Sequence, residues 1–116
     1  MVEHTCHALG CGEVIPPRLL MCRRHWRMVP KKIQDAVVEY YRLGQKHSND
    51  PMTFYCHIAQ RWAVCSVAMK EGLLTLEQAV GRIKKTIDIF SLKEEVSLSV
   101  TANGRIVVHF PEVVQA

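Results

Sequence analysis

Three cysteines and one histidine near the start of the chain have the spacing C-x4-C-x10-C-x2-H. They are Cys6, Cys11, Cys22 and His25. Thiolate sulfur and imidazole nitrogen are the ligands that zinc prefers, and two short-spaced pairs joined by a loop are typical of a structural site in which four ligands surround the ion. The spacing therefore predicts one structural Zn²⁺ ion. Since residues 1–29 contain few large apolar side chains, we expect the metal to contribute roughly 10 kcal/mol or more to their folding.

Other assignments of these side chains stay open. His4 and His7 flank Cys6, and either could take the place of His25, although the C-x2-H spacing favours His25. Clustered thiols can also be simply buried or reactive. A catalytic zinc ion would need an open coordination position and a nearby general base. Glu13 is the only acid within the loop, so a structural ion is favoured over a catalytic one.

The size and composition of the chain limit its architecture. With 116 residues, it is expected to form one domain, or one small domain with a metal-clamped appendage. Hydrophobic residues make up 48% and charged residues 22%, which is the balance of a folded chain rather than a disordered one. The sequence lacks a long apolar run and a secretory signal pattern, so a soluble, cytoplasmic protein is predicted. In a reducing cytoplasm, clustered cysteines favour metal binding over disulfides.

Three helices are predicted after the cysteine-rich loop, because apolar residues recur there every three or four positions. The periodic segments are 30–43, 51–71 and 75–90. Gly44 is interpreted as the stop after the first helix, and Asp50 followed by Pro51 as the start of the second. Thr75 and Gln78 have the spacing of a capping box at the start of the third.

The last part of the chain predicts a β-hairpin, since apolar and polar residues alternate in 96–100 and again in 106–110. Asn103-Gly104 between them is the preferred dipeptide of a tight hairpin turn. The predicted fold class is therefore α+β, with an N-terminal zinc-binding loop, three helices and a C-terminal β-hairpin. The expected organisation is a zinc-binding module at 1–29 and a helical segment with the hairpin at 30–116, packed together as one domain.

Two further cysteines lie in the second predicted helix. Cys56 and Cys65 are nine residues apart, which places them about 180° apart around the helix axis. They cannot bind one ion together. We interpret both as small buried hydrophobic residues.

Cationic residues are concentrated next to the predicted metal site. They are Arg18, Arg23, Arg24, Arg27, Lys31 and Lys32. Arginine and lysine on a rigid module can neutralise several phosphates at once, so these six residues are predicted to bind nucleic acid or another partner. The formal net charge of +4 agrees with an anionic partner but does not require one. A solvated basic rim around the metal site is the plainer interpretation.

The segment CHALGCGEVIPPRLLMCRRHWRMVPKKIQDAVVEYYRLGQ resembles a family of small zinc-finger-like proteins encoded by bacteriophages and prophages. The shared pattern is a cysteine pair, a VPP turn, a CxxHW element and a closing YRxGQ, and it covers about residues 6–45. The resemblance implies that Trp26 packs the zinc loop onto the first helix, and that the metal ligands are Cys6, Cys11, Cys22 and His25. Ile15 replaces the usual valine and Leu43 a common proline. The third helix and the hairpin are additions to the family pattern.

These observations predict a non-enzymatic accessory protein of phage type, in the cytoplasm of a bacterial host cell. It is expected to bind nucleic acid or a nucleoprotein complex through its cationic residues. The alternative is a protein-binding inhibitor of a host defence system, as anti-CRISPR proteins are, or of a host regulatory enzyme. The added helix and hairpin would then be the working surface, and the hairpin edge could pair two copies into a homodimer. No paired carboxylates, nucleophile motif or phosphate-cradling glycine loop indicates an enzyme, and no membrane partner is expected.

Overall fold

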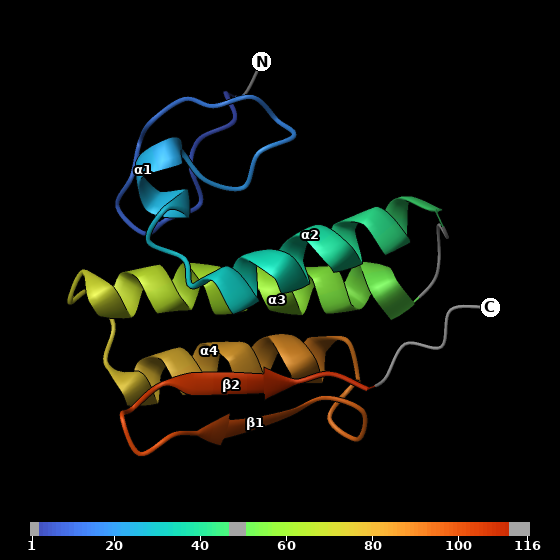
Figure 1. Ribbon diagram of the computed structural model, residues 1–116. Coiled ribbons are helices and arrows are strands. Elements are labelled where there is room, and N and C mark those ends of the chain that lie inside the picture. The colour runs from blue at the N-terminus through green and yellow to red at the C-terminus, as the bar shows by residue number, and fades with distance from the viewer. Residues whose placement is uncertain (1–2, 47–50, 112–116) are drawn as a thin grey trace.

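The computed structural model describes residues 3–46 and 51–111, which form four helices and one two-stranded sheet (Figure 1). In chain order the elements are α1 (Arg23–Trp26), α2 (Lys31–Lys46), α3 (Pro51–Lys70), α4 (Leu76–Ile89), β1 (Ser97–Val100) and β2 (Ile106–His109). The predicted α+β class and the C-terminal hairpin are confirmed. Among the described residues, no helix combines the length and the apolar character that crossing a membrane requires.

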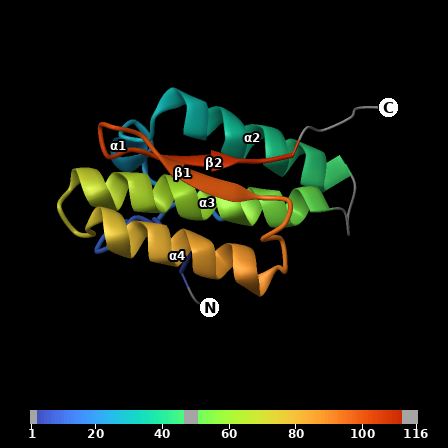
Figure 2. The ribbon, with the colours of Figure 1, turned by 90° about the horizontal axis from the view of Figure 1, so that it is seen from below.

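Helices α2, α3 and α4 run side by side with α3 in the middle, and each is antiparallel to the one before it (Figure 2). The N-terminal loop and α1 lie on one side of this helical layer, and the hairpin lies on the other (Figure 1). As a result α3 is buried around most of its circumference. Its residues with 0% exposure are Ile58, Ala59, Ala63, Cys65 and Val67. Helical periodicity predicts one buried face for α3. Its other faces are buried because the N-terminal loop packs on one side of the helical layer and the hairpin on the other.

The number of helices differs from the prediction, because four are present instead of three. The extra helix, α1, is a single turn inside the segment for which the sequence predicts a loop. Cys22 precedes it in extended backbone as the N-cap, with φ −63° and ψ 163°. One isolated turn of helix is not stable in water. It forms here because its flanking residues are held by tertiary contacts, described below with the metal centre.

The end of α2 also differs from the prediction. Glycine predicts a stop at Gly44, whereas the helix continues through it to Lys46. A Cβ atom at Gly44 would lie 3.2 Å from Thr53 Oγ1. The glycine therefore permits the close approach of α2 and α3 rather than ending the helix. The predicted N-cap Asp50 lies outside the described residues, and α3 begins at Pro51 as expected.

The predicted capping box is present at the start of α4. The Thr75 hydroxyl accepts a hydrogen bond from the Gln78 backbone N–H at 3.1 Å, and the Gln78 side-chain oxygen accepts one from the Thr75 N–H at 2.9 Å. Both N–H groups would lack a partner within the helix. From this fixed start, α4 buries Ala79, Ile83 and Ile87.

The hairpin turns at the predicted Asn103-Gly104 pair, in a loop of three residues, Ala102 to Gly104. The Gly104 N–H donates to the Thr101 carbonyl at 2.9 Å, and the Thr101 N–H donates to the Arg105 carbonyl at 2.8 Å. Gly104 has a φ of 77°. This is the left-handed residue that follows the turn in three-residue hairpin loops. Glycine is needed at position 104 because this residue has a positive φ. It is the third residue of the loop, whereas in a two-residue turn it would be the second.

The hairpin packs on the helices mainly through β2. The Trp62 indole N–H on α3 donates to the Ile106 carbonyl at 3.1 Å, and both Ile106 and Val108 are buried. On the other strand, Val96 just before β1 is buried but Val100 is 47% exposed. The alternating pattern predicts that the apolar side chains of both segments are buried. In the first segment this holds at Val96 but not at Val100.

Removal of the capping hydroxyl is expected to destabilise the protein measurably. Thr75→Ala should lower the free energy of unfolding by about 1 kcal/mol, because one backbone N–H of α4 loses its partner. Urea denaturation of the metal-loaded protein measures this change. Lys84→Ala, at an exposed position on the same helix, is the control and should change the free energy by less than about 0.5 kcal/mol. Equal stability of the two variants would contradict a role for the capping box.

Candidate metal centre

The first pair of candidate ligands lies on a loop whose two sides pair like a small hairpin. The Cys6 N–H donates to the Glu13 carbonyl at 2.9 Å, and the Cys11 N–H donates to the Ala8 carbonyl at 3.1 Å. Between them the chain turns at Gly10, whose φ of 79° is rarely adopted by residues other than glycine. This turn brings Cys11 back toward Cys6.

The second pair of candidate ligands is positioned by α1. Cys22 is the N-cap of this helix and His25 is its third residue. Residues three apart on a helix share a face, and Cys22 Sγ lies 3.2 Å from His25 Nδ1. The His25 side chain is polar but only 2% exposed, so the ring is held among protein atoms.

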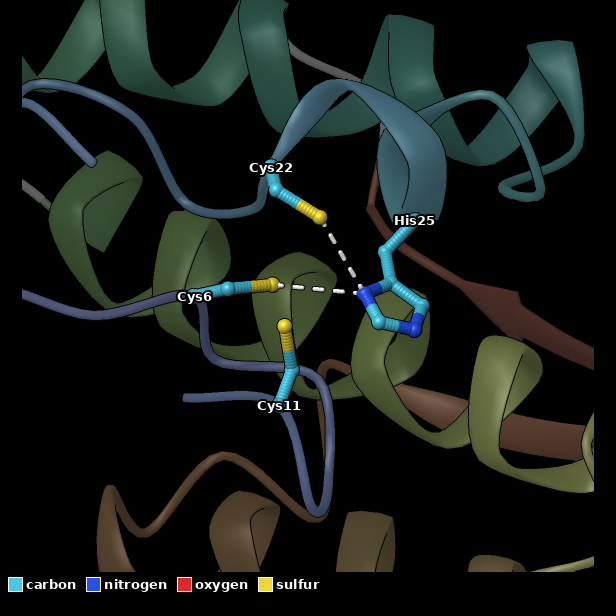
Figure 3. Close-up of side chains that lie close together, drawn as sticks. All are labelled: Cys6, Cys11, Cys22 and His25. Carbon is cyan, nitrogen blue, oxygen red and sulfur yellow. Dashed lines mark hydrogen bonds between the residues drawn. The ribbon is translucent and has the colours of Figure 1, made fainter. Parts of the chain in front are cut away.

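All four side chains point toward one centre (Figure 3). Their ligand atoms lie within 4.8 Å of one another, and Cys6 Sγ lies 3.6 Å from His25 Nδ1. Around a tetrahedral ion with metal–sulfur bonds of about 2.3 Å and metal–nitrogen bonds of about 2.0 Å, neighbouring ligand atoms are about 3.5–3.8 Å apart. The sulfur–nitrogen distances are already close to this spacing. The residues Cys6, Cys11, Cys22 and His25 can therefore hold one metal ion.

The state of the thiols also fits a bound cation. None of the five cysteines, all of which the structure describes, is in a disulfide. Burial raises the pKa of the Cys22 thiol to about 11, and the neighbouring Cys6 thiol adds to the rise. The Cys22 thiol therefore stays protonated at neutral pH when no cation is near. A coordinated divalent ion reverses this preference, because it binds the thiolate and displaces the proton.

The two rival ligands, His4 and His7, lie outside the cluster. The His4 Nε2–H group donates to the Leu19 carbonyl at 2.7 Å, and the His4 and His7 ring centroids are 5.3 Å apart. Partial burial lowers the pKa of His7, and the charges of His4 and Arg61 lower it further. Within the described chain, the ligand set that the fold assembles contains His25 and neither alternative.

Cys56 and Cys65 lie apart from the cluster as well. Both belong to α3 and are 7% and 0% exposed, as expected for small hydrophobic residues. Burial raises the pKa of both thiols, that of Cys56 to about 11. Both are therefore protonated at neutral pH and contribute to core packing.

Glu71 is a member of the site that sequence reasoning missed. Its Oε1 atom lies 3.1 Å from His25 Nε2, on the far side of the ring from the thiols. Arg24 Nη2 also lies 3.1 Å from His25 Nε2. If Nδ1 binds the metal ion, Nε2 keeps the ring proton and donates a hydrogen bond to the Glu71 carboxylate, which also faces Arg24. A carboxylate in this position fixes the tautomer and orientation of a metal-binding histidine. Glu71 follows α3 in the sequence, far from His25, so no local pattern could have indicated it.

Two more hydrogen bonds join residues 3–29, named here the metal-binding module, to the long helices. The Lys70 ammonium donates to the Met28 carbonyl at 2.6 Å, and the Gln34 side-chain amide donates to the Trp26 carbonyl at 2.8 Å. The Trp26 ring is partly buried and packs against the core. Together with the Glu71 contact, these bonds attach the region of α1 to the start of α2 and the end of α3.

The six predicted cationic residues are all exposed, but they do not form a single group. Arg18 and Arg23 line the same hollow beside the metal-binding module. Lys32 lines a different hollow, next to the hairpin turn. Arg27 directly follows α1 as its C-cap. The structure thus brings Arg18 and Arg23 together and separates them from Lys32.

Two of the six cations face carboxylates of the protein itself. Arg24 Nη1 lies 3.7 Å from Glu71 Oε2. The Lys31 ammonium pairs with Asp35 one turn along α2. Arg24, Lys31 and Asp35 are exposed, so the two pairs are worth little to stability. They do reduce the charge that Arg24 and Lys31 offer to a partner.

Comparisons with known proteins leave the site to be interpreted from its own geometry. No family model matches the chain, and neither the curated proteins nor the solved structures include a match.

Loss of the carboxylate behind His25 is expected to weaken metal binding. Glu71→Ala should reduce metal affinity by about 10-fold to 100-fold, because the imidazole loses the acceptor that orients it. Glu71→Gln keeps an acceptor and should fall between this variant and the parent protein. Competition with a chromogenic chelator measures the affinities. Glu77→Ala removes an exposed carboxylate from α4 and serves as the control, so an equal effect of both alanine variants would contradict the assignment.

Proposed function

We propose that this chain is a non-enzymatic, zinc-stabilised accessory protein that binds nucleic acid, alone or in a nucleoprotein complex, through cations next to its metal centre. The observation that carries this proposal is the shared position of Arg18 and Arg23, both exposed and both lining one hollow beside the module. Guanidinium groups bind phosphate oxygens in a bidentate manner. The phage-type sequence pattern supports the accessory role.

Zinc is the metal that best suits the donor set. Three thiolates and one imidazole are typical of structural zinc sites, whereas magnesium and calcium prefer oxygen ligands. Four protein ligands complete a tetrahedral shell, so no position is left for a reactive water molecule. Cys6, Cys22 and His25 are also each less than 5% exposed. These features support a structural rather than a catalytic ion.

A structural ion would make the cationic surface rigid. Arg23 is the first residue of α1, directly after the ligand Cys22, and Arg18 lies four positions before that ligand. Metal coordination therefore limits the motion of the backbone that carries both side chains. Less conformational entropy is lost when a fixed surface binds a partner.

A second candidate function is a protein-binding inhibitor of a host defence system or host enzyme, and the hairpin favours it. The described sheet contains only β1 and β2, and β1 is largely exposed. An exposed strand can add to a partner's sheet or to a second copy of the chain. Salt-insensitive binding to a host protein, with no affinity for nucleic acid, would favour this candidate.

Elemental analysis tests the metal. The purified protein should contain one zinc ion per chain, and Cys22→Ser should contain almost none, because three remaining ligands bind zinc far more weakly. Cys56→Ala also removes one buried thiol but leaves the cluster intact, so it should keep its zinc. A metal-free parent protein, or equal zinc loss in both variants, would contradict the proposal.

Salt-dependent binding tests the cationic surface. The double variant with Arg18→Ala and Arg23→Ala should bind nucleic acid more weakly, and the slope of log affinity against log salt should become shallower by about 1 to 2, because two phosphate contacts are lost. The double variant with Lys84→Ala and Lys85→Ala makes the same change in net charge on the exposed face of α4. Equal effects of the two double variants would indicate general charge attraction and contradict a defined site.

A further inference from the structure

The hollow beside the metal-binding module has an aromatic and apolar lining. Its volume is about 620 Å³, and it lies between the module and helices α2 and α3. The module contributes Trp26, and α2 contributes Val38 and Tyr41. Val38 is 58% exposed and Tyr41 is 47% exposed. Large side chains left half in water beside arginines are typical of surfaces that bind a partner.

A second hollow adjoins the first. Its volume is about 340 Å³, and it shares His7, Leu20 and Gln60 with the first hollow. It adds Arg61 from α3 and Phe90 from the end of α4. We define the two adjoining hollows together as the furrow.

The charges that line the furrow have one sign. Arg18, Arg23 and Arg61 line it, and no aspartate or glutamate is among the described residues of its lining. Glu39 lies on α2 close to the furrow in sequence, but its carboxylate accepts a hydrogen bond from Arg42 at 2.8 Å. Charge complementarity therefore selects an anionic occupant.

We propose that the furrow binds a single strand of nucleic acid, with bases stacked on Tyr41 and Trp26 and phosphates contacted by Arg18 and Arg23. The proposal rests on the function proposed above and assigns a ligand class to that site. A single strand presents unpaired flat bases at regular intervals along a row of phosphates. Aromatic rings set in a basic groove match both of these features.

Other anionic occupants match the furrow less well. The bases of a duplex are stacked on each other inside the helix, so a duplex would contact the arginines through its phosphates and offer no base to the aromatic rings. An acidic peptide supplies charge but lacks flat rings at regular intervals. The combination of rings and guanidinium groups in one hollow therefore favours an unpaired strand.

Fluorescence anisotropy with labelled oligonucleotides tests the assignment. A thymidine oligomer and a uridine oligomer should bind more tightly than a DNA duplex of the same length, and the two single strands show whether the sugar matters. Tyr41→Ala should weaken single-strand binding by about 5-fold to 150-fold, the range expected for one lost stacking contact. Tyr41→Phe keeps the ring and should retain most of the affinity.

A matched control and a second readout separate stacking from indirect effects. Leu73→Ala truncates another exposed apolar side chain, 51% exposed, that lines neither hollow. It should leave affinity unchanged. Bases stacked on Trp26 should also quench its fluorescence, while Trp62, 4% exposed in the core, provides a constant background.

The possible failures are distinct. If strand and duplex bind equally, and Tyr41→Ala has no effect while the double variant with Arg18→Ala and Arg23→Ala weakens both, the furrow proposal is overturned and the proposed function stands. If no oligonucleotide binds, both are overturned. Binding of an oligoglutamate peptide alone, sensitive to Tyr41→Ala, would also overturn both and identify the furrow as a protein-binding site.

Discussion

The metal-binding module depends on one interaction, the convergence of three cysteine sulfur atoms and one histidine nitrogen on a common centre. The loop around Cys6 and Cys11 contains little regular structure, and α1 is one turn long. Neither segment is long enough to be stable by itself. An ion bound by both would join them into one unit, and the free energy of metal binding would then become free energy of folding for this part of the chain.

The His25 ring connects the cysteine cluster to the rest of the protein. Its Nδ1 faces the thiols and its Nε2 faces Glu71 at the end of α3. At its other faces α3 binds the hairpin, through the hydrogen bond from Trp62 to the Ile106 carbonyl. One largely buried helix therefore supports the metal centre on one side and the β-sheet on the other.

Helix geometry explains why neighbouring arginines of α1 lie in different surroundings. Successive residues of a helix point about 100° apart, so neighbouring arginines on one turn cannot share a direction. Arg23 lines the furrow, whereas Arg24 lies near Glu71. Arg23 and Arg24 are adjacent in the sequence, but only Arg23 faces the furrow. Arg24 faces the carboxylate that contacts the candidate ligand His25. Arg18 and Arg61 join Arg23 from other segments.

Features that depend on residues close together in the chain could be predicted from the sequence: the ligand types and spacing, the three long helices, the capping box at Thr75 and the hairpin. Each is visible as a local pattern because the atoms involved are a few residues apart. The other features could not be predicted in this way. Gly44 leaves room for Thr53 of α3 instead of ending α2, and Glu71 lies against His25 across the fold. The furrow is assembled from the loop, α2, α3 and the end of α4. These features depend on contacts between distant segments, which only packing brings together.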